Sequence, residues 1–215
     1  MKLLSINLAR SIWLFHANDL NPRGKDLYPA IELLINLYKF KTIPSQAELS
    51  DPNKEKKFGE GEFINSEGES ISINFIAYND GILADTRSST RDTDDFLDDL
   101  LTKLLEKFSL ANYKEIAIKK AYVSQVYFTT EKHLETLNPK LKDFSSYLTN
   151  KFSHPYELGN ISFWADQISP INPPLFTFER VVSKPFSEKR YYSSSGLQTK
   201  DHLDLLSKLE DILGT

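Results

Sequence analysis

A short run of arginine, tyrosine and serine residues precedes the last helix that the sequence predicts. Arginine and hydroxyl groups beside the free N–H groups of a helix N-terminus are the ingredients of an anion or phosphate site. The residues that offer these groups in or next to this run are Arg190, Tyr192, Ser193, Ser194, Ser195, Lys200 and His202. They form the predicted ligand-binding site. The alternative is that the serine side chains only cap the helix.

A similar run, Arg87-Ser88-Ser89-Thr90-Arg91, precedes an earlier predicted helix. There, Asp92, Asp94 and Asp95 follow at once and would repel an anion. The site is therefore expected once, in the second half of the chain.

The earlier helix also carries four aspartates in the segment Asp94-Asp95-Phe96-Leu97-Asp98-Asp99. This segment resembles the aspartate-rich motif with which isoprenoid synthases hold magnesium and diphosphate, and its spacing puts carboxylates on adjacent helical turns. Those synthases are all-helical, whereas this sequence is rich in predicted strands. We favour the simpler interpretation, in which acidic residues near a helix N-terminus are stabilised by the helix dipole.

Other catalytic or metal-binding patterns are missing from the sequence. The histidines His16, His133, His154 and His202 include no pair at the i, i+4 spacing of a helical zinc site, and there is no cysteine. No Walker lysine motif, GxGxxG loop or GxSxG elbow occurs. The sequence thus predicts no metal, no cofactor and no enzymatic activity. An active site assembled from distant carboxylates is the alternative.

The composition is that of a folded protein without a strong electrostatic field. Hydrophobic residues make up 40% of the chain, and the formal net charge is −4. This balance does not favour nucleic acid or an anionic membrane as a partner. The N-terminal residues mix polar with apolar side chains, and we find no apolar run of the ~20 residues that a spanning helix needs. We therefore expect a cytoplasmic protein without membrane contact.

Hydrophobic periodicity and turn signals predict the same element order in both halves of the chain. In the first half a strand, a helix, three strands and a helix are expected over residues 4–17, 26–40, 58–65, 70–78, 82–86 and 92–108. In the second half they are expected over residues 115–130, 131–152, 161–169, 175–183, 190–194 and 199–213. Asp92 or Thr93 would cap the earlier helix, and Pro139 would break the helix over residues 131–152.

Matching residues support a tandem duplication of one β-α-β-β-β-α unit. Residues 20–27 (LNPRGKDL) and 137–144 (LNPKLKDF) are identical at five of eight positions. Near the ends of the two copies, the stretch Thr93–Leu100 matches Thr199–Leu206 at five positions. The two matched segments lie 11 residues further apart along the chain in the first copy than in the second. A polar insertion at about residues 42–57 of the first copy explains this difference. Chance resemblance between leucine-rich helices is the alternative.

The predicted copies are residues 1–112 and 113–215, packed as one globular α+β unit. We expect a mainly antiparallel curved sheet with helices on one face. This element order resembles the saddle of the TATA-binding-protein fold. The resemblance covers element order alone and has no motif behind it, so it implies a fold and no function.

Aromatic residues in the predicted strands indicate what such a sheet could bind. Trp13 and Phe15 alternate with Ile12 and Leu14, and an uncovered aromatic face would suit a protein interface. The leading hypothesis is a non-catalytic protein-binding or assembly subunit. It would engage a protein partner or another copy of itself through a sheet face or edge strands.

The alternative function is nucleic-acid or nucleotide binding on a saddle-like sheet. The serine-containing loops would contact phosphate, and bases could stack on sheet aromatics. The basic residues in strand regions that support this alternative are Arg10, Lys119, Lys120, Arg180 and Arg190.

Overall fold

A computed structural model describes residues 1–26, 28–51, 54–164 and 175–214, and the chain divides into two compact units. Unit 1 contains Met1–Asn7 and Ser124–Thr215, and unit 2 contains Leu8–Val123. Two strands, β1 (Lys2–Leu14) and β5 (Lys119–Thr129), contribute residues to both units. The predicted copies, in contrast, assign each strand to one half of the chain.

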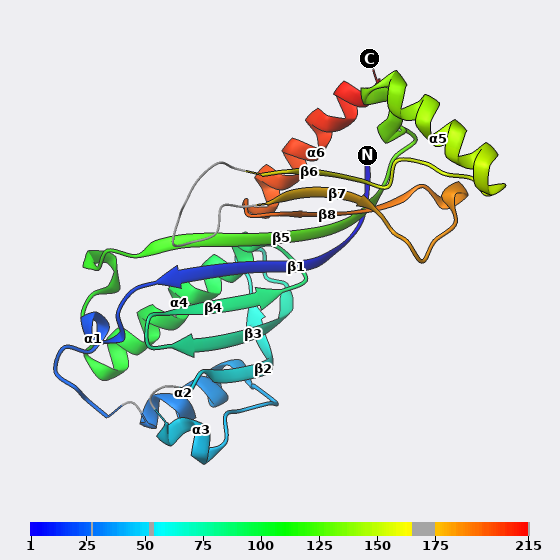
Figure 1. The fold of residues 1–215 in the computed structure, drawn as a ribbon. Coiled ribbons are helices and arrows are strands. Elements are labelled where there is room, and N and C mark those ends of the chain that lie inside the picture. Colours follow the sequence, from blue (N-terminus) through cyan, green and yellow to red (C-terminus); the bar gives the residue numbers. More distant parts are fainter. Residues whose placement is uncertain (27, 52–53, 165–174, 215) are drawn as a thin grey trace. The chain divides into compact units, whose positions relative to one another are not determined.

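Unit 2 combines antiparallel strands in the order β2-β3-β4-β1 with helices (Figure 1). Its further strands are β2 (Lys56–Ile64), β3 (Ser70–Tyr78) and β4 (Gly81–Thr86). Its helices are α1 (Ala17–Leu20), α2 (Tyr28–Tyr38), α3 (Gln46–Ser50), α4 (Thr90–Phe108) and the 3-10 helix η1 (Tyr113–Glu115). The prediction for β3 is confirmed to the residue.

The core of unit 2 lies between its strands and the helices α2 and α4. Phe96 of α4 is fully buried, and its ring lies 4.9 Å from that of Tyr38 and 6.0 Å from that of Phe75. In β1 the buried residues are Ala9, Ser11 and Trp13, together with Phe15 just beyond the strand. Trp13 and Phe15 therefore do not form an uncovered aromatic face, because they are core residues, which is the alternative for such strand aromatics.

Two helix starts in unit 2 differ from the predictions. The N-cap of α4 is Ser89, whose hydroxyl accepts a hydrogen bond from Asp92 N, so neither Asp92 nor Thr93 is the cap. The polar stretch 42–57 is not only a loop, because α3 forms inside it. Ser45 and Glu48 make a capping box there, a signal that the sequence does contain.

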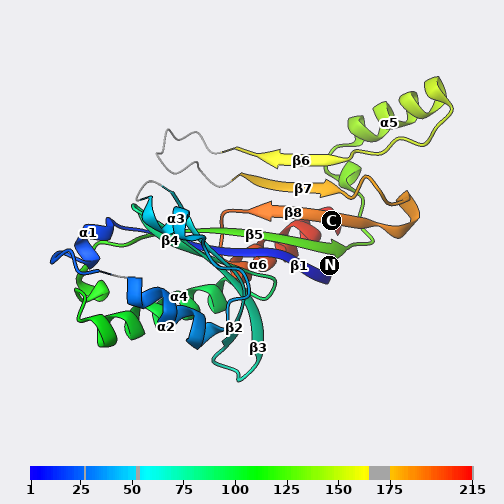
Figure 2. The same cartoon turned by 90° about the horizontal axis from the view of Figure 1, so that it is seen from below.

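Unit 1 places α6 (Thr199–Gly214) against antiparallel strands in the order β5-β8-β7-β6. These neighbouring strands are β6 (Asn160–Phe163), β7 (Phe176–Arg180) and β8 (Arg190–Ser195), which run side by side in Figure 2. The remaining elements are η2 (Leu134–Leu137), α5 (Pro139–Phe152) and η3 (Phe186–Glu188). Residues 165–169 of the predicted strand 161–169 lie outside the described residues.

The predicted break at Pro139 is confirmed, because η2 ends at Leu137 and α5 begins at Pro139 itself. Proline is favoured in the first turn of a helix, where its missing N–H costs nothing. The core of unit 1 is built on Phe128, Phe178 and Tyr191, with ring centroids 5.0–5.9 Å apart. Leu206 and Leu209 of α6 cover these rings.

At the level of class, the α+β prediction with antiparallel strand pairing is confirmed. The described residues form eight strands and six α-helices, and every strand pair with a defined register is antiparallel. None of the described helices has both the length and the apolar character required to cross a bilayer.

Candidate functional site

Strand geometry separates the predicted ligand residues into two groups. Arg190–Ser195 is the strand β8, which confirms the strand expected over residues 190–194, so its side chains alternate between two faces. Ser193 and Ser195 are buried on the side of α6, whereas Tyr192 and Ser194 point to the opposite face. Lys200 is exposed on α6. Of the seven predicted residues, the structure brings Ser193 and His202 into direct contact.

His202 lies between two serine hydroxyls and is fully buried. Its Nε2 is 2.9 Å from Ser193 Oγ, and its Nδ1 is 2.9 Å from Ser124 Oγ on β5. Ser193 in turn donates to the Thr177 carbonyl oxygen at 2.6 Å. The Phe176 ring stands edge-on to the imidazole at 6.1 Å.

These contacts fix the protonation of the imidazole. Because the Ser193 proton goes to Thr177, Ser193 Oγ can only accept from His202, so Nε2 carries the hydrogen. Nδ1 then accepts from the Ser124 hydroxyl. Burial lowers the pKa of His202 to about 4, which keeps the ring neutral. A neutral imidazole with both nitrogens occupied and no solvent contact has a structural role in unit 1.

The other predicted residues on β8 are satisfied by neighbours. Arg190 Nε forms an ion pair with Glu188 at 2.9 Å. The Tyr192 ring packs on the Tyr127 ring at 5.3 Å, and burial raises the pKa of Tyr192. The ligand-binding prediction for these residues stays a prediction.

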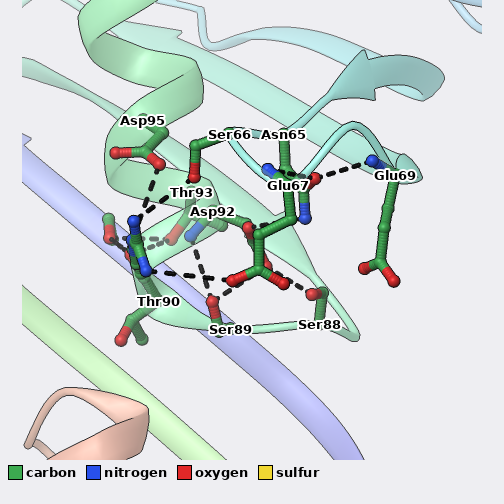
Figure 3. A network of polar contacts seen from close by, with 12 residues as sticks. Asn65, Ser66, Glu67, Glu69, Ser88, Ser89, Thr90, Asp92, Thr93 and Asp95 are labelled. Carbon is green, nitrogen blue, oxygen red and sulfur yellow. Dashed lines mark hydrogen bonds and ion pairs between the residues drawn. The ribbon is translucent and has the colours of Figure 1, made fainter.

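In unit 2, the hydroxyl groups of the corresponding run before α4 are bound to the carboxylate of Asp92 (Figure 3). Asp92 accepts hydrogen bonds from the hydroxyls of Ser88 and Ser89, and from Asn65 Nδ2 at 3.2 Å. Asn65 Oδ1 accepts from two backbone N–H groups of the β2–β3 turn. Asp92 therefore sits where an anion would bind, which agrees with the expectation that this helix start would repel one.

The aspartates of α4 accept hydrogen bonds from aromatic side chains. Asp94 accepts from Trp13 Nε1 at 2.7 Å and from Tyr122 Oη at 2.9 Å. Tyr38 and Tyr113 donate to Asp99 and Asp98 at 2.8 and 2.6 Å. Within the described parts of the chain, no group of three or more potential ligands is arranged to hold a metal ion. The aspartate-rich segment thus ties α4 to its aromatic neighbours.

Unit 2 also contains an apolar recess of about 410 Å³ bordered by α2 and the strands. Its walls include Leu34, Phe58, Phe75, Ile82 and Leu101. The lining is almost entirely hydrocarbon, so the recess suits a compact apolar molecule more than a charged substrate.

Most basic residues that supported nucleic-acid binding are already neutralised. Arg10 Nε and Nη2 hold both oxygens of Asp85 at 2.6 and 2.7 Å. Lys120 lies 3.8 Å above the Trp13 ring and 3.8 Å from Asp94. These cations are directed at neighbouring groups and do not form an open basic surface.

An uncovered apolar surface of unit 1 lies on α5, which projects from the strands (Figures 1 and 2). Ser145 is the one buried residue of this helix. Phe144 and Tyr147 are 58% and 61% exposed, and their rings stack at 6.4 Å. Leu141 and Phe152 continue the apolar stripe at helical spacing and are also exposed. Sequence periodicity indicates a helix here, but it cannot show that the apolar face stays uncovered.

Strand β6 supplies a second exposed apolar group. It is the outer strand of the order β5-β8-β7-β6, and among the described residues it pairs only with β7. Phe163 at its end and the following Trp164 are 56% and 81% exposed. Exposed aromatic groups of this size are typical of interaction surfaces.

No protein-family model matches this sequence, and no curated protein matches it either.

Proposed function

We propose that this chain is a non-catalytic, cytoplasmic protein-binding or assembly subunit that acts through unit 1. The observation that carries the proposal is α5, where Leu141, Phe144, Tyr147 and Phe152 are solvent-exposed. Folded proteins usually bury such a stripe against another element, because exposed hydrocarbon costs about 25 cal/mol per Å². A protein partner would bury the apolar stripe of α5.

The charges beside the stripe indicate the chemistry of that partner. Lys140, Lys142 and Lys151 flank the apolar residues of α5, and Asp143 is the one acidic residue of the helix. A second copy of the same helix would bring lysines against lysines and is disfavoured. A partner segment with apolar side chains bordered by carboxylates is favoured, because its apolar side chains would cover the stripe and its carboxylates would pair with the lysines.

Strand β6 supports the same proposal, since a sheet edge can accept an added strand. Its backbone gives hydrogen-bonding groups without sequence specificity, and Phe163 and Trp164 provide apolar contact area. The half-buried Tyr127 and Tyr192 on the face opposite α6 add a third surface of the kind expected from the sequence.

The test is binding by the full chain with one exposed aromatic residue changed. We expect a partner that binds the wild type to lose at least tenfold in affinity with Phe144→Ser, because the stripe loses its central side chain. Ile212→Ser is the matched control, since Ile212 is 60% exposed on α6. The proposal is contradicted if both variants bind equally, or if native mass measurements and cross-linking in cells show a monomer without partners.

Nucleic-acid binding is the competing function, and the paired state of Arg10 and Lys120 weighs against it. It requires an affinity for single- or double-stranded probes that falls steeply with added salt. An absence of any shift at low salt would remove it.

We also propose the tandem duplication, and with it a saddle-like arrangement resembling the TATA-binding-protein fold. Support comes from the order of strands within each unit. In unit 2 the first strand neighbours the fourth, followed by the third and the second, and unit 1 follows the same rule from β5 to β6. Each unit also ends in a long helix, α4 or α6.

A further inference from the structure

Unit 1 contains a recess of about 600 Å³ at the end of β7 and the start of β6. Its lining includes Glu157, Gly159, Arg180, Lys184 and Phe186. None of the seven residues of the predicted ligand-binding site lines this recess. Arg180, the last residue of β7, is its central charged group.

The guanidinium of Arg180 is buried but only partly hydrogen-bonded. The residue is 8% exposed, and its Nη1 donates to Glu157 Oε2 at 3.0 Å. Its Nε and Nη2 have no hydrogen-bond partner among the described residues and no contact with solvent. Buried donors of a charged group that lack an acceptor cost several kcal/mol in general, so such a group calls for an explanation.

The unused nitrogens form one edge of the guanidinium, and the same chain shows what this edge binds. In unit 2, Arg10 uses Nε and Nη2 to hold the two carboxylate oxygens of Asp85 at 2.6 and 2.7 Å. Two parallel N–H groups match the two oxygens of a carboxylate. The edge that holds Asp85 on Arg10 therefore has no hydrogen-bond acceptor among the described residues on Arg180.

The surrounding charges favour a carboxylate over a more highly charged anion. Arg180 shares its charge with Glu157, and Glu179 accepts from Asn160 Nδ2 at 3.2 Å. Lys184 forms no ion pair with any described residue, so it can balance one incoming negative charge. A phosphate dianion would face two carboxylates and one free cation, which is unfavourable.

We propose that this recess binds a carboxylate carried by a protein partner, in a bidentate pair with Arg180 Nε and Nη2. The inference rests on the proposed protein-binding function and names the group that unit 1 recognises. Val182, which is 99% exposed, and the Phe186 ring give apolar contact beside the charge. β6 begins at Asn160 in the same lining, so a segment added to its edge ends near Arg180.

Access to the nitrogens requires a small movement of the wall. The Phe186 ring lies 4.1 Å from the guanidinium carbon and belongs to η3, none of whose residues is buried. The proposal therefore requires that this ring moves away when a carboxylate binds.

The test follows the Arg180 Nε–H resonance of the full chain by NMR during titration with small probes. The probes are N-acetylvaline, which carries a C-terminal carboxylate, and the α-amide of N-acetylglutamate, which carries a side-chain carboxylate. N-acetylvalinamide and inorganic phosphate serve as comparisons at constant ionic strength. We expect a saturable shift with one or both carboxylates and none with the amide. Equal shifts with amide or phosphate, or none up to 50 mM carboxylate, an order-of-magnitude limit for specific binding, overturn the inference.

Variants separate binding from folding. Arg180→Gln leaves Glu157 without its partner and can unfold unit 1, so Lys184→Gln is the informative change. We expect about tenfold weaker carboxylate binding with Lys184→Gln and no change with Lys208→Gln on α6. If Lys184→Gln leaves carboxylate binding unchanged, the role of Lys184 in the recess is wrong.

The small probes need no protein partner, so the two proposals fail separately. If the carboxylate probes bind but no protein partner is found, the proposed function is contradicted, whereas the carboxylate site at Arg180 is not. A protein partner that binds the chain, together with no shift of Arg180 Nε–H on addition of either carboxylate probe, contradicts the inference and leaves the function intact.

Discussion

The buried imidazole of His202 makes the stability of unit 1 depend on pH. Its pKa is about 4 in the folded protein and about 6.5 when exposed, so between these values the unfolded chain binds a proton that the folded chain does not. The contribution is complete above pH 6.5 and is lost as the pH falls towards 4. The expected loss is about 3 kcal/mol, measured by urea unfolding from pH 7.5 to 4.5.

The matched variant is His202→Phe, which places in unit 1 the residue that stands at the corresponding position of α4, Phe96. The difference in unfolding free energy between wild type and His202→Phe should shrink as the pH falls. His133→Asn, at an exposed position, should follow the wild type at every pH. A difference that stays constant across the range would show that His202 does not titrate as its burial requires.

At the scale of elements, α2 and α5 stand at comparable places in the chain order but have opposite surroundings. Leu34 of α2 is 6% exposed, whereas Phe144 of α5 is 58% exposed. We expect Leu34→Ala to lower the free energy of unfolding by about 2–5 kcal/mol through the cavity that it leaves. Phe144→Ala should change it by less than about 0.5 kcal/mol. Chemical denaturation of both variants provides the measurement, and equal losses would mean that α5 is packed after all.

The elements themselves follow from local patterns, and these are visible in the sequence. Ser70–Tyr78 alternates polar and apolar residues along its whole length, and Pro139 marks a helix start, so both were predicted well. It was harder to assign which alternate residues of β1 face the core. Ile12 and Leu14 look like core residues, but Ala9, Ser11 and Trp13 are the buried set. A small buried serine carries no hydrophobic signal, so the sequence pattern favours the wrong face.

The candidate sites depend on contacts that span the sequence and were therefore less predictable. His202 was included in the predicted ligand-binding site, but its partner Ser124 lies 78 residues away, on β5. Arg180 was assigned to a possible phosphate surface because sequence cannot show that its Nε and Nη2 are buried without acceptors. Exposure of the α5 stripe likewise depends on what the rest of unit 1 leaves uncovered.

At the scale of the whole molecule, β1 and β5 link the thermal behaviour of the two units. Each strand supplies residues to both, so neither unit has a complete set of strands that belongs to it alone. We expect one cooperative unfolding transition. Fluorescence of the buried Trp13, measured in a Trp164→Phe background, should report the same midpoint as far-UV circular dichroism.

A substitution in unit 2 should therefore lower both midpoints together. Leu34→Ala serves this purpose because its side chain belongs to the unit 2 core. Two separate transitions, with the Trp13 signal lost first, would instead establish that each unit unfolds on its own.

The division of β1 has a consequence for how the protein forms during translation. Met1–Asn7 are synthesised before Leu8–Val123, but their neighbours in unit 1, Ser124–Thr215, are synthesised after it. At roughly 5–20 residues per second, the ribosome needs about 5–20 s after residue 123 to supply them. Unit 2 can collapse during that interval, while Met1–Asn7 still lack their neighbours in unit 1. Nascent chains stalled near residue 123 should accordingly expose Met1–Asn7 to proteases and chaperones, and synthesis of the remaining residues of unit 1 should protect this segment.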